Sequence, residues 1–460
     1  MELIDLTPRL VPHDPLADLP VAVIGAGPIG LTAAVHLRER GLDALVLEKG
    51  DEPASALREW GHVRLFSPWE HLVDPVVETA LAATDWSRPT DSYEPLGSEF
   101  VRDYVEPLAA LPSLDGVVRY GTEVLAVTRE GKDRTRTTAR SQAPFVLRVR
   151  SADGHVEELR ARAVLDASGT WGQPAPLGSH GLDPLGAEEV ADRLLPGLPD
   201  VLGVDRDRVA GTHVTVVGAG HSAANTLIAL AALAEEEPDT RVTWLLRNAN
   251  AARVSTGDDE LEGRGALGSR LEQLVADGRV EVVDSFEIAR LEDLPGGGVR
   301  AHGVPGAGRL GVGEGGGSAC CGTDSAADCG DGAGAPVHDT DLLVAATGFR
   351  PDLSILSEVR TAVDEIVQAP VRLAPLIDPN EHSCGTVAPH GYRELSHPEP
   401  GLYVVGMKSY GRAPTFLLKT GYEQVRSVVA WIAGDTEAAA HVELELPETG
   451  VCNVDAGGCC

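Results

Sequence analysis

The fold of this chain is decided by the stretch Val21-Ala-Val-Ile-Gly25-Ala-Gly27-Pro-Ile-Gly30. Its apolar start predicts a buried strand, and its glycines predict a tight turn into a helix. Gly25 permits the turn, Gly27 lets the backbone approach a pyrophosphate, and Gly30 allows the helix to pack closely on the strand. The N-terminus of such a helix presents free N–H groups to phosphates. The stretch therefore predicts a dinucleotide-binding site.

The residues after this turn complete a strand–helix–strand unit over residues 20–50. A helical pattern runs from Leu31 to Arg40, and a second apolar strand runs from Ala44 to Leu47. Glu48 ends that strand, 18 residues after Gly30. An acidic side chain at this position can accept hydrogen bonds from both ribose hydroxyls of a bound nucleotide.

The same chemistry recurs later in the chain, in the stretch Val214-Thr-Val-Val-Gly218-Ala-Gly220-His-Ser222-Ala223. Gly218 and Gly220 repeat the phosphate-binding pattern, and Ser222 can donate its hydroxyl to a pyrophosphate. Ala223 stands where the first turn has its third glycine, and its side chain is still small. Two such turns predict that the chain holds two dinucleotides.

The second strand–helix–strand unit covers residues 212–247 and ends in Arg247 rather than in an acidic residue. A carboxylate there would bind the ribose 2′-hydroxyl of NADH and repel a 2′-phosphate. A guanidinium can instead pair with that phosphate. We therefore expect NADPH rather than NADH at the second site, the alternative being that Arg247 is a solvated charge at a strand end.

Length and charge limit the classes of function. The chain has 460 residues, 43% of them hydrophobic, and a formal net charge of −32. This length predicts two or three domains, and the negative charge disfavours nucleic acids and anionic membranes as partners. No stretch reaches the roughly 20 apolar residues that span a bilayer, and Met1-Glu-Leu-Ile-Asp5 lacks the features of a signal peptide. We expect a cytoplasmic protein.

Further motifs connect the two turns to a known superfamily. These motifs are Ala167-Ser-Gly169-Thr170, Ala345-Ala-Thr-Gly348-Phe-Arg-Pro-Asp352 and Tyr403-Val-Val-Gly406. Together with the two turns they resemble the flavoproteins that have two dinucleotide-binding domains, among them flavin-containing monooxygenases and thioredoxin reductases. The resemblance covers roughly residues 20–435. One departure is Met407, which follows Gly406 where the superfamily usually has aspartate.

This resemblance implies an α/β fold with two Rossmann-like domains, in which an NAD(P)H-binding domain is inserted in a discontinuous FAD-binding domain. The first turn would hold FAD and the second NADPH. The implied segments are residues 1–175 and 341–435 for FAD, residues 205–340 for NAD(P)H, and residues 436–460 as a flexible tail. The cofactor contacts expected are Gly25, Gly27, Gly30, Glu48, Gly169, Gly218, Gly220, Ser222, Ala223, Arg247, Gly348 and Gly406.

A cluster of aromatic and basic residues lies where the chain of the superfamily passes near the flavin ring. Its members are Trp60, His62, Arg64, Phe66 and Trp69. Aromatic residues make up only 4% of the chain, so their density here is notable. The cluster is interpreted either as a lining of the flavin site or as an ordinary core with one surface turn.

The reaction is inferred largely by elimination. A flavin disulfide reductase uses a cysteine pair beside the flavin, and the chain has no cysteine before Cys320. A monooxygenase instead passes electrons to O2 in a water-poor pocket and needs no dedicated catalytic side chain. We therefore expect an FAD- and NADPH-dependent monooxygenase acting on a small molecule, with no residue assigned as catalytic. A homodimer is left open.

All seven cysteines lie late in the chain, and several are adjacent in sequence. Adjacent thiolates suit soft thiophilic ligands, and the layout is similar to flavin monooxygenases associated with bacterial arsenic resistance, which oxidise trivalent arsenicals. The alternative is that the cysteines are incidental. No metal site is expected, because paired Cys-x-x-Cys ligands are missing. The candidate substrate-binding residues are Cys384, Cys452, Cys459 and Cys460.

Two other functions remain open from the sequence. One is an NADPH-dependent reductase of a metal or thiol substrate that uses the C-terminal cysteines. The other is a flavoprotein of low turnover that binds metalloids or senses redox state. Residues 311–335, which are rich in glycine, predict a loop with too few apolar residues to form a core of its own.

Overall fold

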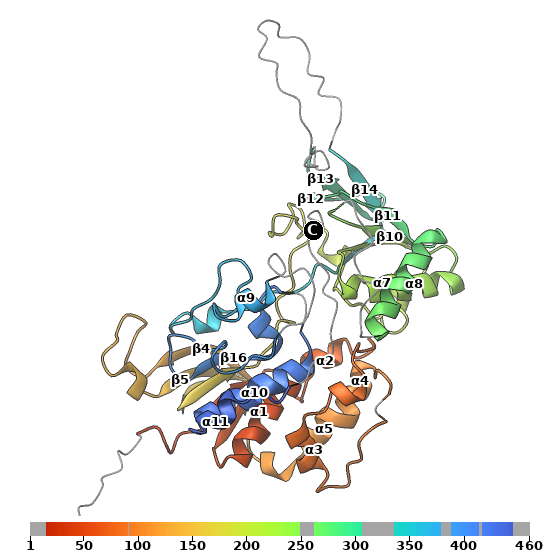
Figure 1. The fold of residues 1–460 in the computed structure, drawn as a ribbon. Helices are drawn as coiled ribbons and strands as arrows, with labels where there is room; N and C mark the ends of the chain where they lie inside the picture. The colour runs from red at the N-terminus through yellow and green to blue at the C-terminus, as the bar shows by residue number, and fades with distance from the viewer. Residues whose placement is uncertain are drawn as a thin grey trace, which may run out of the picture.

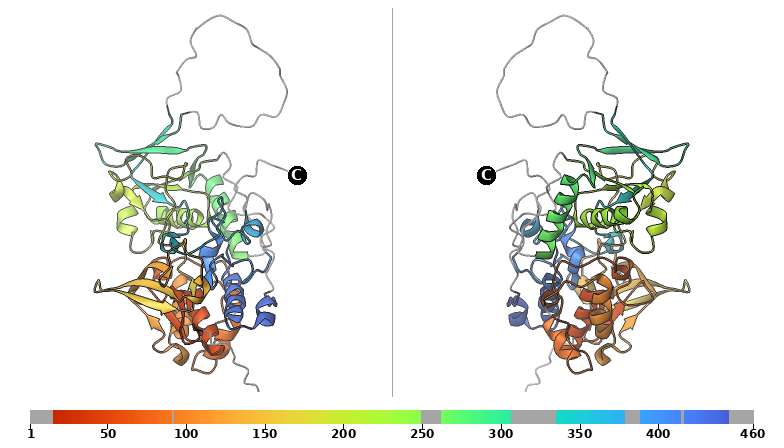
Figure 2. Two further views of the ribbon diagram at one scale, coloured as in Figure 1. Left: turned by 90° about the vertical axis from the view of Figure 1, so that its left-hand side faces the viewer. Right: turned by 90° about the vertical axis from the view of Figure 1, so that its right-hand side faces the viewer.

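A computed structural model describes most of the chain, which forms two lobes (Figures 1 and 2). The N-terminal segment and the C-terminal helices share one lobe, and the middle of the chain forms the other (Figure 1). Within the described part of the chain, no helix is both long enough and apolar enough to cross a membrane. The described residues are 15–90, 92–248, 262–305, 335–378, 388–413 and 416–444.

The first lobe is built on a five-stranded parallel sheet with the order β16-β7-β1-β2-β3. Alternate residues of β1 face opposite sides: Val21 and Val23 pack in the helical core, whereas Ala22 and Ile24 pack toward an antiparallel sheet, β4-β5-β6. The strands are β1 (Val21–Ile24), β2 (Ala44–Leu47), β3 (Val118–Arg119), β4 (Thr122–Arg129), β5 (Phe145–Ser151), β6 (Val156–Ala161), β7 (Ala163–Asp166) and β16 (Leu402–Val404).

Helices cover the other face of this sheet, with α1 and α10 in contact side by side (Figure 1). Short helices between residues 55 and 110, which the sequence did not predict, extend the same core, and α4 and α5 are joined through a π-helical stretch, Val101–Val105. The helices of this lobe are α1 (Pro28–Glu39), α2 (Ser55–Glu59), α3 (Pro75–Leu81), α4 (Gly97–Phe100), α5 (Glu106–Ala109), α9 (Ala374–Ile377), α10 (Leu418–Ile432) and α11 (Thr436–Ala440).

The second lobe repeats the design with the strand order β11-β10-β9-β15-β8, all parallel. One face packs on α7, and the other packs on an antiparallel sheet, β12-β13-β14. Its elements are β8 (Leu194–Leu195), α6 (Arg206–Val209), β9 (His213–Val217), α7 (His221–Glu236), β10 (Arg241–Leu245), α8 (Glu262–Ala276), β11 (Glu281–Val283), β12 (Ile288–Asp293), β13 (Val299–Gly303), β14 (Val337–Thr340) and β15 (Leu342–Ala345).

The structure confirms the predicted fold class of two Rossmann-like units, because each lobe has a parallel sheet with a glycine turn after a central strand. One boundary differs from the prediction. Residues 342–345 pair with β9 in the second sheet, although the sequence placed them with the segment that returns to the first. A fully buried strand is apolar in either sheet, so its composition does not reveal its partner. The predicted loop lies, apart from Ala335, outside the described residues.

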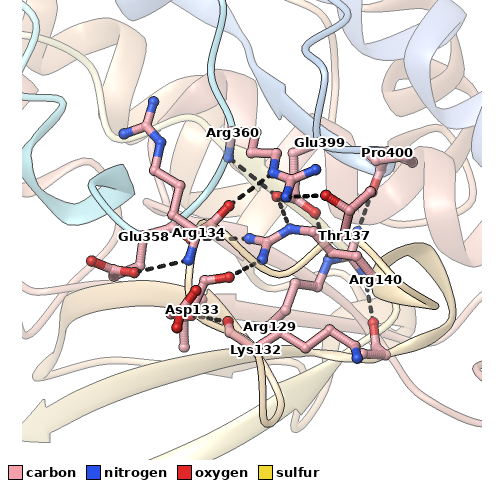
Figure 3. Close-up of polar contacts among 12 residues, drawn as sticks. Arg129, Lys132, Asp133, Arg134, Thr137, Arg140, Glu358, Arg360, Glu399 and Pro400 are labelled. Atoms are coloured by element: carbon pink, nitrogen blue, oxygen red, sulfur yellow. Dashed lines mark hydrogen bonds and ion pairs between the residues drawn. The ribbon is translucent and has the colours of Figure 1, made fainter.

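A buried network of charges ties the β4–β5 hairpin to the segment that precedes β16 (Figure 3). Arg129 Nε lies 2.9 Å from Glu399 Oε1, and Arg140 Nε lies 2.8 Å from Glu399 Oε2. The three side chains are almost fully buried, and the Arg129 guanidinium also lies 3.5 Å from the ring centre of Phe145. Burial raises the pKa of Glu399, but the hydrogen bonds from Arg140 and Arg129 outweigh it, so its pKa is lowered. Glu399 is therefore held as a carboxylate.

His397, two residues before this network, predicts a loss of stability in acid. Its Nδ1 accepts the Ala362 N–H at 3.2 Å, and its buried Nε2 has no hydrogen-bond partner among the described residues. Burial lowers the pKa of His397 from its ordinary value of 6.5 to about 4. Between these two values the unfolded chain binds more protons than the folded chain, so the free energy of unfolding decreases as the pH falls through this window.

We expect the His397→Asn variant to lose part of this pH dependence, because asparagine can accept the Ala362 N–H without titrating. Urea unfolding at a series of pH values measures the effect, and the exposed His155→Asn variant is the matched control. An unchanged slope between the two pH limits in the His397 variant would contradict the prediction.

Candidate functional site

One cavity of about 1150 Å³ joins the two lobes at their glycine turns. Its walls come from the loops that follow β1, β2, β7 and β16 in the first lobe and β9, β10 and β15 in the second. These loops lie at the carboxyl ends of parallel strands, which is where open α/β sheets bind their ligands.

The first glycine turn is shaped for a ligand at one position and for packing at two others. Gly25 has a φ of +99°, and a Cβ on Gly30 would lie 2.0 Å from Gly25 O. In contrast, a Cβ on Gly27 would meet nothing within 4 Å, and Gly27 lines the cavity. Gly27 is also the N-cap of α1 and gives it no side-chain cap, so N–H groups of this helix end are left for a ligand.

Glu48 lies at the edge of the same turn, where its carboxylate is held by the backbone. Its Oε2 accepts the Ala26 N–H at 2.7 Å, and its Oε1 accepts the Gly50 N–H at 2.8 Å. Each oxygen of a carboxylate has a second lone pair, so both can still accept from a ligand hydroxyl. Since Glu48 also lines the cavity, its position suits contacts with a ribose.

The second turn has the same division of roles. Gly218 has a φ of +131°, and a Cβ there would lie 2.1 Å from Ala346 O. Gly220, the N-cap of α7, has open space around its missing Cβ and no side-chain cap. The indole N–H of Trp244 donates to Gly218 O at 2.6 Å and so helps to hold the turn in place. A second helix end is therefore open toward the same cavity.

The charge of the cavity is opposite to that of the chain. Four arginines and one carboxylate, that of Glu48, line it within the described residues. The net charge of the whole chain is −32, so a local excess of cations is not explained by composition. A cavity with cationic walls attracts anionic ligands such as dinucleotides. The arginines are Arg64, Arg247, Arg350 and Arg412.

Aromatic side chains form another wall. The rings of Trp171 and Phe349 lie 4.8 Å apart, and Trp60 lies 6.3 Å from Trp171. Phe66 from the first lobe contacts the ring of His221, the first residue of α7, at 4.8 Å. These contacts give the cavity an apolar region between the two turns.

A buried ion pair lies behind the wall near the first turn. Lys408 Nζ lies 2.6 Å from Asp166 Oδ2 and donates to Ser168 Oγ at 3.0 Å, while Ser168 Oγ donates to Asp166 Oδ1 at 2.6 Å. Asp166 is fully buried and Lys408 nearly so. The pair fixes the loop after β7, which lines the cavity, against the turn Gly406–Tyr410 after β16.

Comparison of the sequence with protein families agrees with this geometry. The family model of the pyridine nucleotide-disulphide oxidoreductases matches residues 22–297, more than half of the chain. The chain belongs to the pyridine nucleotide-disulphide oxidoreductase family. As a member of this family it is an oxidoreductase.

Two curated relatives of this oxidoreductase are similar over parts of their length. The bacilliredoxin reductase Bdr of Bacillus subtilis is 48% identical over 50 residues, which are 11% of this chain and 15% of that protein. The flavin-containing monooxygenase FMO GS-OX-like 2 of Arabidopsis thaliana is 30% identical over 197 residues, 37% of this chain and 40% of that protein. The matches therefore span less than half of either relative.

Solved structures share the fold of this family member over nearly its whole length. The bacillithiol disulfide reductase Bdr of Bacillus cereus has a TM-score of 0.61 and 18% sequence identity, covering 90% of this chain and 99% of that one. At this identity the similarity supports the fold.

The predicted site residues of this oxidoreductase fall in three groups. Most line the cavity between the lobes, whereas Gly30 and Ala223 lie inside α1 and α7. The four candidate cysteines, like every cysteine of the chain, lie outside the described residues. The residues that line the cavity are Gly25, Gly27, Glu48, Gly169, Gly218, Gly220, Ser222, Arg247, Gly348 and Gly406.

The predicted aromatic cluster divides between the cavity and the core. Trp60, Arg64 and Phe66 line the cavity, but Trp69 is fully buried and packs on Phe100 at a ring distance of 5.8 Å. His62 does not line the cavity either. Trp69 therefore fits the interpretation as a core residue, whereas Trp60, Arg64 and Phe66 lie on the cavity wall.

Sequence reasoning did not single out several residues of the site. Trp171 and Phe349 are in contact only because the loops after β7 and β15 meet, and no sequence spacing relates them. Lys408 lies two residues beyond the Gly406 motif, and nothing in the sequence shows that its side chain is buried against Asp166. Composition gives no signal for contacts of this kind.

Proposed function

We propose that this oxidoreductase binds FAD at the first glycine turn and NADPH at the second, and that it passes electrons to O2 as a monooxygenase of small molecules. The observations that support the proposal are one cavity that opens onto both turns and a sequence that has no cysteine before Cys320. Bound FAD would supply the electron transfer between the nicotinamide and the acceptor.

The first turn fits FAD in its chemistry. The open space at Gly27 admits a pyrophosphate, the uncapped end of α1 supplies N–H donors, and Glu48 supplies acceptors for the ribose. We assign the flavin to the lobe formed by the N-terminal segment up to about residue 175 and the segment returning up to residue 435. NADPH is assigned to the intervening lobe.

Arg247 is proposed to select NADPH by pairing with its 2′-phosphate. The side chain is exposed, lines the cavity and has no ion-pair partner among the described residues. Loss of a hydrogen bond to a charged group costs about 1.5 to 3 kcal/mol, or roughly ten- to a hundredfold in binding. We expect Arg247→Ala to raise the KM for NADPH near the lower end of this range, because exposure to solvent weakens the contact.

Steady-state rates with each nicotinamide measure this effect, and NADH is the internal control because it lacks the 2′-phosphate. Arg208→Ala, a variant at an exposed arginine outside the cavity, is the matched control for surface charge. An equal change in the KM values for NADH and NADPH would place Arg247 away from the phosphate.

Oxygen dependence distinguishes the monooxygenase from the second candidate, an NADPH-dependent reductase of a thiol or metal substrate. The similarity to bacilliredoxin reductase and the family itself favour that candidate. NADPH oxidation is measured with and without O2 in the presence of organic sulfides, amines, ketones and trivalent arsenicals. Turnover that needs both a substrate and O2 supports the monooxygenase. Anaerobic turnover supports the reductase, and negligible turnover supports a metalloid-binding or redox-sensing protein.

A soft, thiophilic substrate such as a trivalent arsenical is proposed from the adjacent cysteines of the sequence, which lie outside the described residues. Thiolates favour soft acceptors, and converging sulfurs add their affinities by effective concentration. We expect the Cys459→Ser/Cys460→Ser and Cys384→Ser variants to need more arsenical for the same NADPH oxidation. If both variants match the unmodified protein at limiting arsenical, the cysteines have no part in the reaction.

A further inference from the structure

The turn that follows β16, Gly406–Tyr410, forms part of the cavity wall beside the first glycine turn. Gly406 and Met407 line the cavity. Gly406 has a φ of +71°, and a Cβ on it would lie 3.3 Å from two side-chain carbon atoms of Ile29, in the first turn of α1. This part of the wall therefore lies against the helix end at which FAD is proposed to bind.

Gln424, a residue of α10, holds this turn through hydrogen bonds. Its Oε1 accepts the Gly406 N–H at 2.8 Å, and its Nε2 donates to Ser409 Oγ at 2.9 Å. Ser409 Oγ donates in turn to Gly406 O at 2.7 Å. The side chains of Gln424 and Ser409 are both fully buried. Gln424 thus fixes the N–H of Gly406 directly and its carbonyl through Ser409.

His390 completes the network and determines its polarity. Its Nε2 lies 2.9 Å from Gln424 Nε2, and its Nδ1 lies 3.0 Å from Ala388 O. Because Gln424 Oε1 accepts the Gly406 N–H, the amide nitrogen faces His390, and an amide nitrogen can only donate. His390 Nε2 must therefore accept, and the ring carries its one proton on Nδ1, which donates to Ala388 O. Each polar side-chain atom of the two residues then has a partner.

The network is compatible with only one protonation state of His390, which is 2% exposed. A proton on Nε2 would face an N–H of Gln424, and two buried donors would then lack an acceptor. If the amide turned its oxygen toward His390, its nitrogen would face the Gly406 N–H instead. Either arrangement loses a hydrogen bond that holds the turn.

The surroundings of His390 favour the neutral ring. Burial lowers its pKa below the ordinary value of 6.5, although the backbone hydrogen bond and the carboxylates of Glu394 and Glu423 oppose this shift. Glu423 also pairs with Arg426 at 2.7 Å. From the turn itself, the ring of Tyr410 lies 5.7 Å away, and burial raises the pKa of its hydroxyl, so it stays uncharged.

We propose that Gln424 is a positioning residue for the flavin, which holds the turn Gly406–Tyr410 as a wall of the FAD site only while His390 is neutral. Affinity for FAD is then complete at neutral pH and decreases as the pH falls below 6.5 and through the lowered pKa of His390. The inference rests on the proposed function, because it takes FAD to bind at the first glycine turn.

The test is the Gln424→Glu variant, which keeps the shape of the side chain and replaces its donor by an acceptor. At about pH 8 the new carboxylate faces the lone pair of His390 Nε2, and Ser409 loses a donor. We expect FAD affinity, measured by fluorescence titration of the flavin-free protein, to be about tenfold lower. In acid the carboxyl and imidazole groups take up one proton between them. The affinity of the variant should therefore rise as the pH falls, whereas that of the unmodified protein should decrease.

His390→Gln keeps the test decisive if the first variant does not fold. An amide oxygen at this position can still accept from Gln424, but it does not titrate, so the decrease of FAD affinity in acid should be lost. Gln142→Glu is the matched control for the change of charge, because Gln142 is exposed and lies outside the cavity. Its pH profile should match that of the unmodified protein.

All titrations are confined to the pH range in which circular dichroism shows a folded protein. Parallel pH profiles for the unmodified and Gln424→Glu proteins would overturn the proposal, as would a decrease in acid that persists in His390→Gln. A lower unfolding midpoint with unchanged FAD affinity would also overturn it, because the role of Gln424 would then be structural only. Absence of FAD binding by the unmodified protein instead contradicts the proposed function, so the two failures are distinguishable.

Discussion

Replacement of Gly27 by valine will abolish FAD binding while the protein stays folded. A Cβ at Gly27 meets no protein atom within 4 Å, so the fold has room for a side chain there. The added methyl groups would instead occupy cavity space next to the uncapped end of α1, where the pyrophosphate is proposed to bind. We expect flavin content to fall by about a hundredfold or more, because a steric block removes several hydrogen bonds at once.

Flavin released by heating measures the occupancy, and circular dichroism measures the fold. Gly296→Val is the matched control, since Gly296 also has open space around its missing Cβ and lies outside the cavity. Gly220→Val should weaken NADPH binding and leave the flavin in place. A Gly27→Val protein that keeps its FAD would refute the assignment of the first turn.

Replacement of Glu399 by glutamine will cost the protein about 3 to 5 kcal/mol of stability, the range observed when one partner of a buried ion pair is removed. The substitution preserves shape but leaves the guanidinium groups of Arg129 and Arg140 without a counter-charge (Figure 3). Both are almost fully buried, so water cannot replace the carboxylate.

Urea unfolding, followed by a probe in each lobe, measures this loss, because a protein with two lobes need not unfold in one step. The expected change is confined to the first lobe, which contains the whole network. Glu358→Gln is the matched control: this carboxylate is exposed and accepts a single long hydrogen bond from Arg134 N at 3.3 Å. Equal unfolding midpoints for the two variants would show that the buried network contributes little.

Much of the fold could be predicted from the sequence because the glycine turns have strict geometric requirements. The predicted strand from Ala44 to Leu47 has the observed bounds of β2, since it is a short apolar run closed by a turn. The short helices α2 to α5 have no such signal. They are stabilised by packing in the core around residues such as Phe100 and Leu108 and not by their own periodicity.

The site divides in a similar way. Positions whose role follows from backbone geometry, such as Gly27 and Gly220, can be found in a sequence because few residues other than glycine meet the requirement. Positions whose role follows from tertiary contacts cannot be found in this way. Trp171 and Phe349 are 178 residues apart in the sequence, and only the fold brings their rings to 4.8 Å from one another.

The ion pair of Lys408 and Asp166 joins residues that are 242 positions apart. During synthesis on a ribosome, the whole second lobe is made after β7 and before β16. The pairing of β16 with β7 can therefore form only after the second lobe has been synthesised. Until that moment Asp166 has no cation, and the edge of the first sheet is exposed. Contacts of such long range form slowly and leave partly folded chains open to aggregation. The topology therefore sets the order of folding. The second lobe can fold during translation, and the first lobe is completed last.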